Sequence, residues 1–426
     1  MKSLKLSLVA IALVGMGSTV NAADTLADAL MNGRTTVDFK AFYFDGDRDN
    51  RADRKALAVG GILKSVSAPL NGFKVGIAFY TSHDLIRDGE QTVQKGSIAN
   101  GGSENIVTKN IGGNTEMVNS DGSSITVLGE AYLQYNTGNT MIKIGRQRLN
   151  TPLANDYYNR FLPNSFEALV IANSDIKDTT LIGAYVNKWK YKASDKFIGM
   201  TSKLGLDEDV IMLAAINKSI PNTKIQAYYY MVPDVANAFY LQANNKKLVE
   251  FKGGSVCGAV QYLNQQDAGD ALAGALDTYL AGAKLGVKYN NASFKVMYDK
   301  VGDDTIIGSG TSYSSLGWSK FINFTDIQID GEALNAGAES YGFVLGYGFG
   351  NLKPAFKFVH VEQDLTMNSA FTGNTRPSSD EWNIDVKYKI DKQSKIRVRY
   401  ANIDYESTHK NEFDEDNLRI IYDYKF

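Results

Sequence analysis

The sequence is poor in the residues on which most catalytic and metal sites depend. Its single cysteine among 426 residues, Cys257, excludes an intrachain disulfide and a cysteine-rich zinc site. The three histidines, His83, His360 and His409, are far apart and suggest no Ser-His-Asp arrangement, so we expect no enzyme and no bound metal or cofactor. No charge sign dominates either: 45 Lys+Arg stand against 47 Asp+Glu, which argues against a nucleic-acid-binding protein.

Long apolar runs are also missing. No stretch approaches the ~20 residues that a transmembrane helix needs, and the mean hydropathy is -0.24. A shorter apolar run, residues 6–14, follows Lys2 and Lys5 and precedes small residues that end at Ala22. This is the pattern of a cleaved signal peptide. We therefore expect residues 1–22 to direct export and residues 23–426 to form a single domain.

Glycine and aromatic residues are abundant, with 39 Gly, 24 Tyr and 20 Phe, and apolar positions recur with a period of two. Phe73, Val75 and Ile77 share one face of such a run. Residues 281–289 and 382–390 alternate in the same way, and residues 125–136 are expected to do so with Ile125 and Val127 facing outward. This alternation is typical of membrane strands with one face in lipid and the other toward a lumen.

Short and long segments between these strands alternate along the chain. Eight short ones, such as residues 244–247, carry turn residues, and nine long ones include residues 148–165 and 301–339. Residues 197–205 could pass for a strand but are assigned to the fourth long loop. The pattern predicts an all-β fold, a transmembrane antiparallel β-barrel of about 18 strands with short periplasmic turns and long external loops.

The last residues alternate as well and end in an aromatic side chain. Leu418, Ile420, Tyr422, Tyr424 and Phe426 share one face. A C-terminal strand that ends in Phe resembles the signal by which barrels reach the barrel-assembly machinery. We therefore expect a multi-pass protein of the cell outer membrane, in contact with lipid and lipopolysaccharide, monomeric or homotrimeric, and without a nucleic-acid partner.

The most specific string is GRQRLNTPLANDYYNRFLPNSFEA, residues 145–168. It resembles the OprD (Occ) family of substrate-selective outer-membrane porins, to which the major outer membrane proteins of epsilonproteobacteria are related. The positions that match are Gly145, Gln147, Leu149, Pro152, Asp156, Arg160, Leu162, Pro163, Phe166 and Glu167. Ala168 departs from the family, which commonly has glycine there.

The resemblance implies an eighteen-stranded barrel whose third and seventh external loops fold inward, beside a ladder of basic side chains that guides carboxylate-bearing solutes. We accordingly expect residues 148–165 to form the pore constriction, with Asn150, Pro152, Asp156 and Arg160 at its narrowest part. Proline stiffens the limbs of this loop, and Asp156 and Arg160 supply charge of both signs.

Basic residues also fall on the lumen phase of strands near the C-terminus, each one position out of step with apolar neighbours. They are Lys357, Lys395, Arg397, Arg399 and Arg419. A solvated lumen is polar in any barrel, but guanidinium groups also bind carboxylates bidentately. We interpret these five residues as a basic lumen track.

The resulting hypothesis is a passive outer-membrane porin for small hydrophilic solutes, with a preference for those that carry carboxylates. Two alternatives are a non-selective general porin and a structural or adhesive barrel, for which the Gly/Asn-rich residues 99–122 are the supporting feature. Asp45, Asp47 and Asp49 have the spacing of a calcium loop. Since Ala56 stands where the bidentate Glu is needed, a polar hairpin loop is favoured for residues 45–53.

Overall fold

The computed structural model describes residues 23–49, 53–88, 91–94, 105–108, 115–303, 316–317, 319–326, 328, 336–363, 378–406 and 414–426. The expected signal peptide, much of the Gly/Asn-rich segment 99–122 and parts of the expected calcium-like loop and seventh loop lie outside these residues. Among the described residues, no helix is long and apolar enough to cross a membrane.

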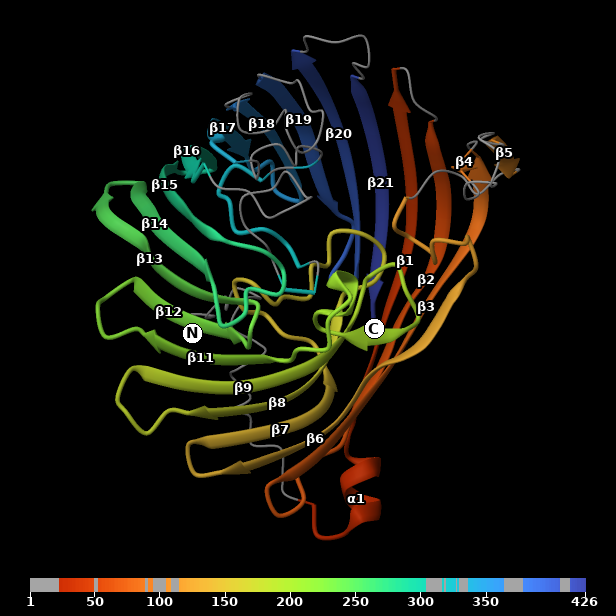
Figure 1. Ribbon diagram of the computed structural model, residues 1–426, viewed down its shortest axis with the longest axis vertical. Coiled ribbons are helices and arrows are strands. Elements are labelled where there is room, and N and C mark those ends of the chain that lie inside the picture. Colours follow the sequence, from red (N-terminus) through yellow and green to blue (C-terminus); the bar gives the residue numbers. More distant parts are fainter. Residues whose placement is uncertain are drawn as a thin grey trace.

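Eighteen antiparallel strands of the described chain close into one barrel (Figure 1). They are β1 (Arg34–Arg48), β2 (Arg54–Val66), β3 (Phe73–Asp88), β6 (Ile125–Thr137), β7 (Thr140–Gln147), β8 (Ser165–Asn173), β9 (Thr179–Lys190), β11 (Val210–Asn217), β12 (Thr223–Val232), β13 (Ala236–Phe251), β14 (Gly254–Asp267), β15 (Asp277–Tyr289), β16 (Ala292–Val301), β17 (Glu339–Tyr347), β18 (Leu352–Glu362), β19 (Ser378–Lys389), β20 (Ser394–Glu406) and β21 (Glu415–Lys425). The predicted fold class and strand number are confirmed.

Each strand pairs with its neighbours along the chain, and β1 pairs with β21 to close the barrel from Asp38↔Lys425 to Arg48↔Glu415. The seam extends by two backbone hydrogen bonds of 2.9 Å between Val37 and Phe426. A closed sheet leaves no unpaired edge, which is the condition for strands to span hydrocarbon.

Three small elements lie outside the barrel wall. The helix α1 (Leu26–Met31) begins at Thr25, whose hydroxyl caps the Asp28 N–H, and it lies at the foot of the barrel in Figure 1. The hairpin of β4 (Gln91–Gln94) and β5 (Asn105–Thr108) stands apart from the wall. The short strand β10 (Phe197–Gly199) pairs with the end of β9 and is followed by a 3-10 turn, so residues 197–205 belong to a loop as predicted.

The outer face of the barrel is apolar. Phe79, Leu285 and Ile384 are exposed there by 48%, 49% and 46%. Inside, buried polar residues such as Glu130 and Gln261 occupy the opposite phase of their strands. Apolar outside and polar inside is the arrangement of a membrane barrel.

Two local sequence predictions were wrong because of β-bulges. Residues 244–247 are not a turn: β13 continues to Phe251, with a register shift between Asn245 and Val249. A second shift, where Ala78 pairs with Glu130 and Phe79 with Leu128, reverses the phase of β6. Ile125 therefore points inward and is completely buried. The one extra residue in β6 exchanges the two faces of that strand beyond the bulge, whereas the two extra residues in β13 do not exchange its faces.

The lumen face also carries apolar side chains where a loop packs against it. Phe42 and Phe44 on β1 point inward and are completely buried. They share a cluster with Phe161 and Leu162 of the loop after β7, which are also fully buried. This apolar floor holds one limb of that loop inside the barrel.

Candidate pore and its constriction

Gly145 lies near the end of β7, just before the chain turns into the barrel. Its φ of 115° is unfavourable for L side chains, and an added Cβ would lie 2.3 Å from the Ala131 carbonyl oxygen. Just beyond, the side-chain amide of Gln147 donates to the Ala168 carbonyl oxygen at 2.9 Å. Ala168, where the family commonly has glycine, stands beside a register shift in β8. The bond from Gln147 nevertheless holds the two ends of the loop together.

The loop of residues 148–165 contacts nearly opposite walls of the barrel. Near its start, the Leu153 N–H donates to the hydroxyl oxygen of Tyr230 on β12 at 3.2 Å. Near its end, the ammonium of Lys40 on β1 donates to the carbonyl oxygens of Arg160 and Phe161 at 3.0 and 3.2 Å. Since β1 and β12 are eight strands apart in a ring of eighteen, the loop crosses the lumen.

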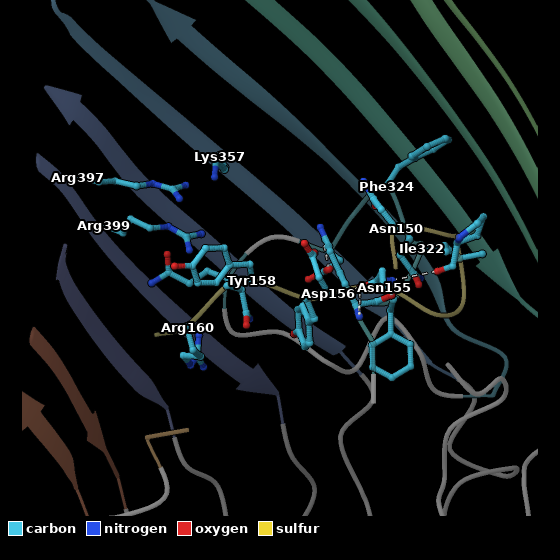
Figure 2. A pocket seen from close by; sticks show the side chains of 18 of the residues that line it. Asn150, Asn155, Asp156, Tyr158, Arg160, Ile322, Phe324, Lys357, Arg397 and Arg399 are labelled. Atoms are coloured by element: carbon cyan, nitrogen blue, oxygen red, sulfur yellow. Dashed lines mark hydrogen bonds and ion pairs between the residues drawn. The ribbon is translucent and has the colours of Figure 1, made fainter. Parts of the chain in front are cut away.

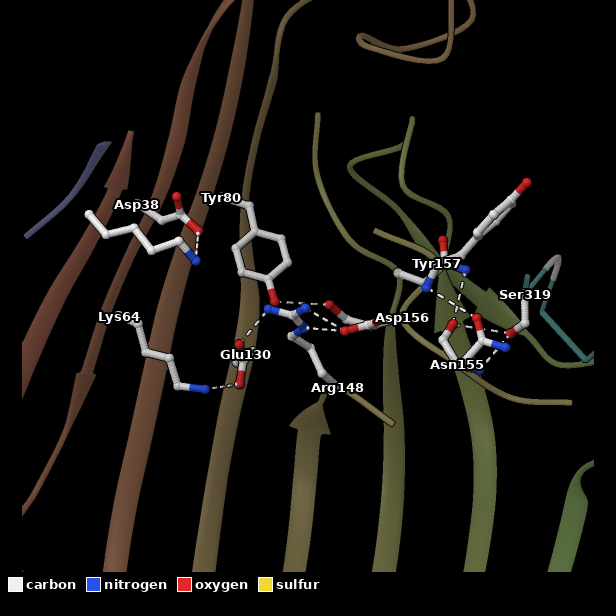
Figure 3. A network of polar contacts seen from close by, with 12 residues as sticks. Asp38, Lys64, Tyr80, Glu130, Arg148, Asn155, Asp156, Tyr157 and Ser319 are labelled. Atoms are coloured by element: carbon white, nitrogen blue, oxygen red, sulfur yellow. Dashed lines mark hydrogen bonds and ion pairs between the residues drawn. The ribbon is translucent and has the colours of Figure 1, made fainter. Parts of the chain in front are cut away.

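Figure 3 shows polar side chains where this loop meets the wall formed by β2, β3 and β6. The two are joined at the end of the loop, where the Ser165 hydroxyl donates to the Tyr80 hydroxyl oxygen at 3.5 Å. Arg148 donates from Nε to Asp156 at 2.9 Å, within the loop itself. On the wall, Glu130 accepts from Tyr80 at 3.0 Å and pairs with Lys64 at 2.6 Å. Asp156 thus stabilises the loop from within, because one of its carboxylate oxygens already accepts a hydrogen bond from the guanidinium of Arg148.

Asn155 joins the loop to residues 319–320 of the seventh loop, next to the described residues 316–317. Its amide donates to the Lys320 carbonyl oxygen at 3.0 Å and its side-chain oxygen accepts from the Lys320 N–H at 2.8 Å. The Asn155 N–H donates to the Ser319 hydroxyl oxygen at 2.7 Å, and the Leu316 N–H donates to the Leu153 carbonyl oxygen at 2.8 Å. The third and seventh loops therefore form one bonded unit inside the barrel.

Glu116 braces the same loop from the preceding external loop. Its carboxylate lies 3.0 Å from the ammonium of Lys192 and 3.3 Å from Nε of Arg160, and it accepts a hydrogen bond from Tyr191. Burial alone raises the pKa of Glu116, but Lys192 and Arg160 outweigh it and lower this pKa from 4.5 to about 2.

This depressed pKa predicts an acid-sensitive brace. Because the folded pKa lies below the ordinary value, the stabilisation by Glu116 is present above pH 4.5 and is lost as the pH falls toward 2. We expect open-channel current noise to remain constant from pH 7 to 5 and to rise between pH 4 and 2. Glu116→Gln should be noisy throughout that range, and a noise rise of equal size in this variant would contradict the assignment.

All nine predicted site residues line one cavity of about 1050 Å³ inside the barrel. Arg397, Arg399 and Arg160 lie on one side of it with Tyr158, and Asn150, Ile322 and Phe324 lie on the other (Figure 2). Twelve Lys or Arg residues line this cavity against four Asp residues and no Glu. Its lining is thus strongly cationic although the whole chain is nearly neutral.

An acidic residue, Asp385, lies among the cations of the basic track but does not line the cavity. Asp385 on β19 has a side chain only 2% exposed and lies beneath the track. It accepts from Arg397 Nε at 2.8 Å and from Lys357 Nζ at 3.0 Å, and it lies 3.9 Å from Arg399. Asp385 therefore holds these cations in place while it cancels part of their field.

Removing that acid should strengthen the field. We expect Asp385→Asn to shift the reversal potential further toward anions, because the amide keeps hydrogen-bonding capacity but adds one net positive charge to the wall. A salt-gradient measurement in planar bilayers checks this. Asp391→Asn, in the adjoining exposed turn, is the matched control and should leave the potential unchanged; a shift toward cations with Asp385→Asn would contradict this role.

Several cavity residues were missed from the sequence. Lys40, Lys224 and Lys284 line the cavity and fall on the lumen phase of their strands, so the alternation alone could have found them. Asn155 had no such signal, because its role depends on Ser319 and Lys320, more than 160 residues away. Among the described residues, no group of three or more His, Cys, Asp or Glu is placed to hold a metal ion.

A closed barrel with an apolar outer face and a charged cavity bounded by inward loops defines a transmembrane channel protein of the porin class. The family model described as outer membrane porin, OprD family, matches residues 108–426. The chain therefore belongs to the OprD family of outer membrane porins, as its motif predicted, and is a protein of the outer membrane.

Several solved structures share this fold. Pseudomonas aeruginosa OccK9 (OpdG) is 16% identical, with 93% of this chain and 99% of that chain covered and a TM-score of 0.74. P. aeruginosa OccK1 (OpdK) is 17% identical over 93% and 99%, with a TM-score of 0.73. Acinetobacter baumannii OccAB2 is 20% identical over 94% and 99%, with a TM-score of 0.73. No curated protein matches the chain by sequence.

Proposed function

We propose that this porin passes small hydrophilic solutes by passive diffusion and favours those that carry a carboxylate. The observation that supports this most directly is the cavity lining, with twelve cationic side chains against four acidic ones. Low-dielectric walls around a narrow, water-filled passage focus such a field and make it stronger than in bulk water. The channel supplies a water-filled path, a constriction and a potential.

We further propose that residues 148–165 set the narrowest point. Asn150, Pro152, Asp156 and Arg160 all line the cavity, and the loop is bonded to β1, β12 and the seventh loop. A loop held at this many points resists displacement by solutes.

Two measurements test the proposal. The first is the reversal potential of the channel in a planar bilayer under a potassium chloride gradient. The second compares the rates at which butyrate, added as its sodium salt, and a neutral sugar enter proteoliposomes. We expect anion preference, with butyrate entering faster than a sugar of similar size. Equal entry of butyrate and sugar would favour the general-porin alternative, and absence of any conductance would favour a structural barrel.

A further inference from the structure

The cationic lining is not confined to the basic track. Lys224 on β12 and Lys284 on β15 also line the cavity. Along the ring of paired strands, β12 is nine strands from β21, which is half of eighteen, and β15 is five strands from β20. Lys224 thus stands across the cavity from the strand that bears Arg419, and Lys284 stands between that position and the strands of the basic track.

These two lysines differ from the lysines of the track in their partners. On the track side, Lys357, Lys395 and Lys425 each have a carboxylate oxygen within 3.0 to 3.2 Å. In the described part of the chain, no carboxylate oxygen lies within 4.0 Å of Lys224 or Lys284. The nearest acid that acts on Lys284, Asp299 on β16, is buried and bonded to Gln261 and Thr325, so neither lysine has a carboxylate paired with it among the described residues.

Lys284 is held by an aromatic ring instead. Its ammonium lies 3.9 Å from the centroid of Phe324, a residue of the seventh loop that also lines the cavity. A cation–π contact fixes the position of an ammonium and leaves its charge uncompensated. All three ammonium hydrogens keep the capacity to donate to oxygen atoms of a solute.

Cations on separate walls of one cavity suit a solute with negative charge at both ends. A second carboxylate adds a large dehydration penalty on entry, and only a second cation near that end offsets it. We propose that Lys224 and Lys284 form a second anion-binding wall and that the channel selects small dicarboxylates, whose two charges are offset by cations on more than one side of the cavity. This inference rests on the proposed carboxylate preference and names its substrate class.

The test compares bi-ionic reversal potentials for succinate, butyrate and sulfate in planar bilayers. We expect wild-type protein to be more permeable to succinate than to butyrate. The variant K224Q/K284Q should lower succinate permeability by roughly fivefold and change butyrate permeability by less than roughly twofold. Sulfate, whose two charges share one group, should fall less than succinate does.

Matched variants separate this role from general surface charge and from misfolding. K218Q/K288Q removes two exposed lysines that lie outside the cavity, in the turn before β12 and on β15, and should behave as wild type. K224R/K284R keeps both charges and should retain the succinate preference. All variants must first migrate as folded barrels in electrophoresis without boiling.

The outcomes distinguish the two levels of the proposal. Equal losses for succinate and butyrate in K224Q/K284Q, or for succinate and sulfate, would overturn the dicarboxylate assignment while leaving carboxylate preference intact. Wild-type protein that favours sodium over all three anions would instead refute the proposed function itself.

Discussion

Removal of residues 151–159, with Asn150 joined to Arg160 through two glycines, is expected to raise single-channel conductance severalfold and to weaken selectivity. The deletion takes out the Leu153 contact with Tyr230 and every bond of Asn155 to Lys320 and Ser319. It also widens the cavity, and ionic conductance rises with pore cross-section. Planar-bilayer recordings of the purified variant measure the effect.

The control for this deletion is a shortened loop on the same side of the barrel. Residues 269–272, between β14 and β15, line neither this cavity nor the pocket that Leu153 shares with Ala273 and Gly274, and their removal should leave conductance unchanged. A correctly folded 151–159 deletion with wild-type conductance would refute the constricting role of the third loop.

Changing Arg397 and Arg399 together to Gln is expected to move the reversal potential toward cations and to slow a carboxylate tracer roughly tenfold. An anion ~7 Å from one cation gains ~2 kcal/mol at an effective dielectric constant of 20, and salt screens part of this. The two arginines lie on the lumen side of β20 and line the cavity. Uptake of a neutral sugar should change little, because it has no net charge to interact with the track.

The matched control replaces Lys353 and Lys389, which belong to neighbouring strands but do not line the cavity. Their replacement by Gln removes the same formal charge and should leave both measurements at wild-type values. If the arginine variant slows carboxylate and sugar equally, the track lines the pore without selecting solutes.

The alternation of side chains was enough to predict the barrel and one wall of its lumen. A charge in the lipid phase of a membrane strand costs ~2 to 4 kcal/mol near the midplane, so the inward direction of Arg397, Arg399 and Arg419 followed from their apolar neighbours alone. The same rule failed at Ile125, because the bulge that reverses β6 has no reliable signal in a single sequence.

The interior of the pore was less predictable than its wall. The motif of residues 145–168 identified the loop, and its candidates all reached the cavity. The groups that hold the loop, Asn155 and Glu116, were missed because their partners come from other loops. The apolar floor that includes Phe42 and Phe44 was also missed, because strand positions that face the lumen of a membrane barrel are normally polar.

The bond between Asn155 and Ser319 has a consequence for how the barrel is made. It closes a segment of 164 residues, which contains the strands from β8 to β16. The entropy lost on closing so long a loop is large for one contact, but it is small once the intervening hairpins have paired in order. This contact between the third and seventh loops therefore forms late in folding, after the hairpins that separate them in the sequence have paired.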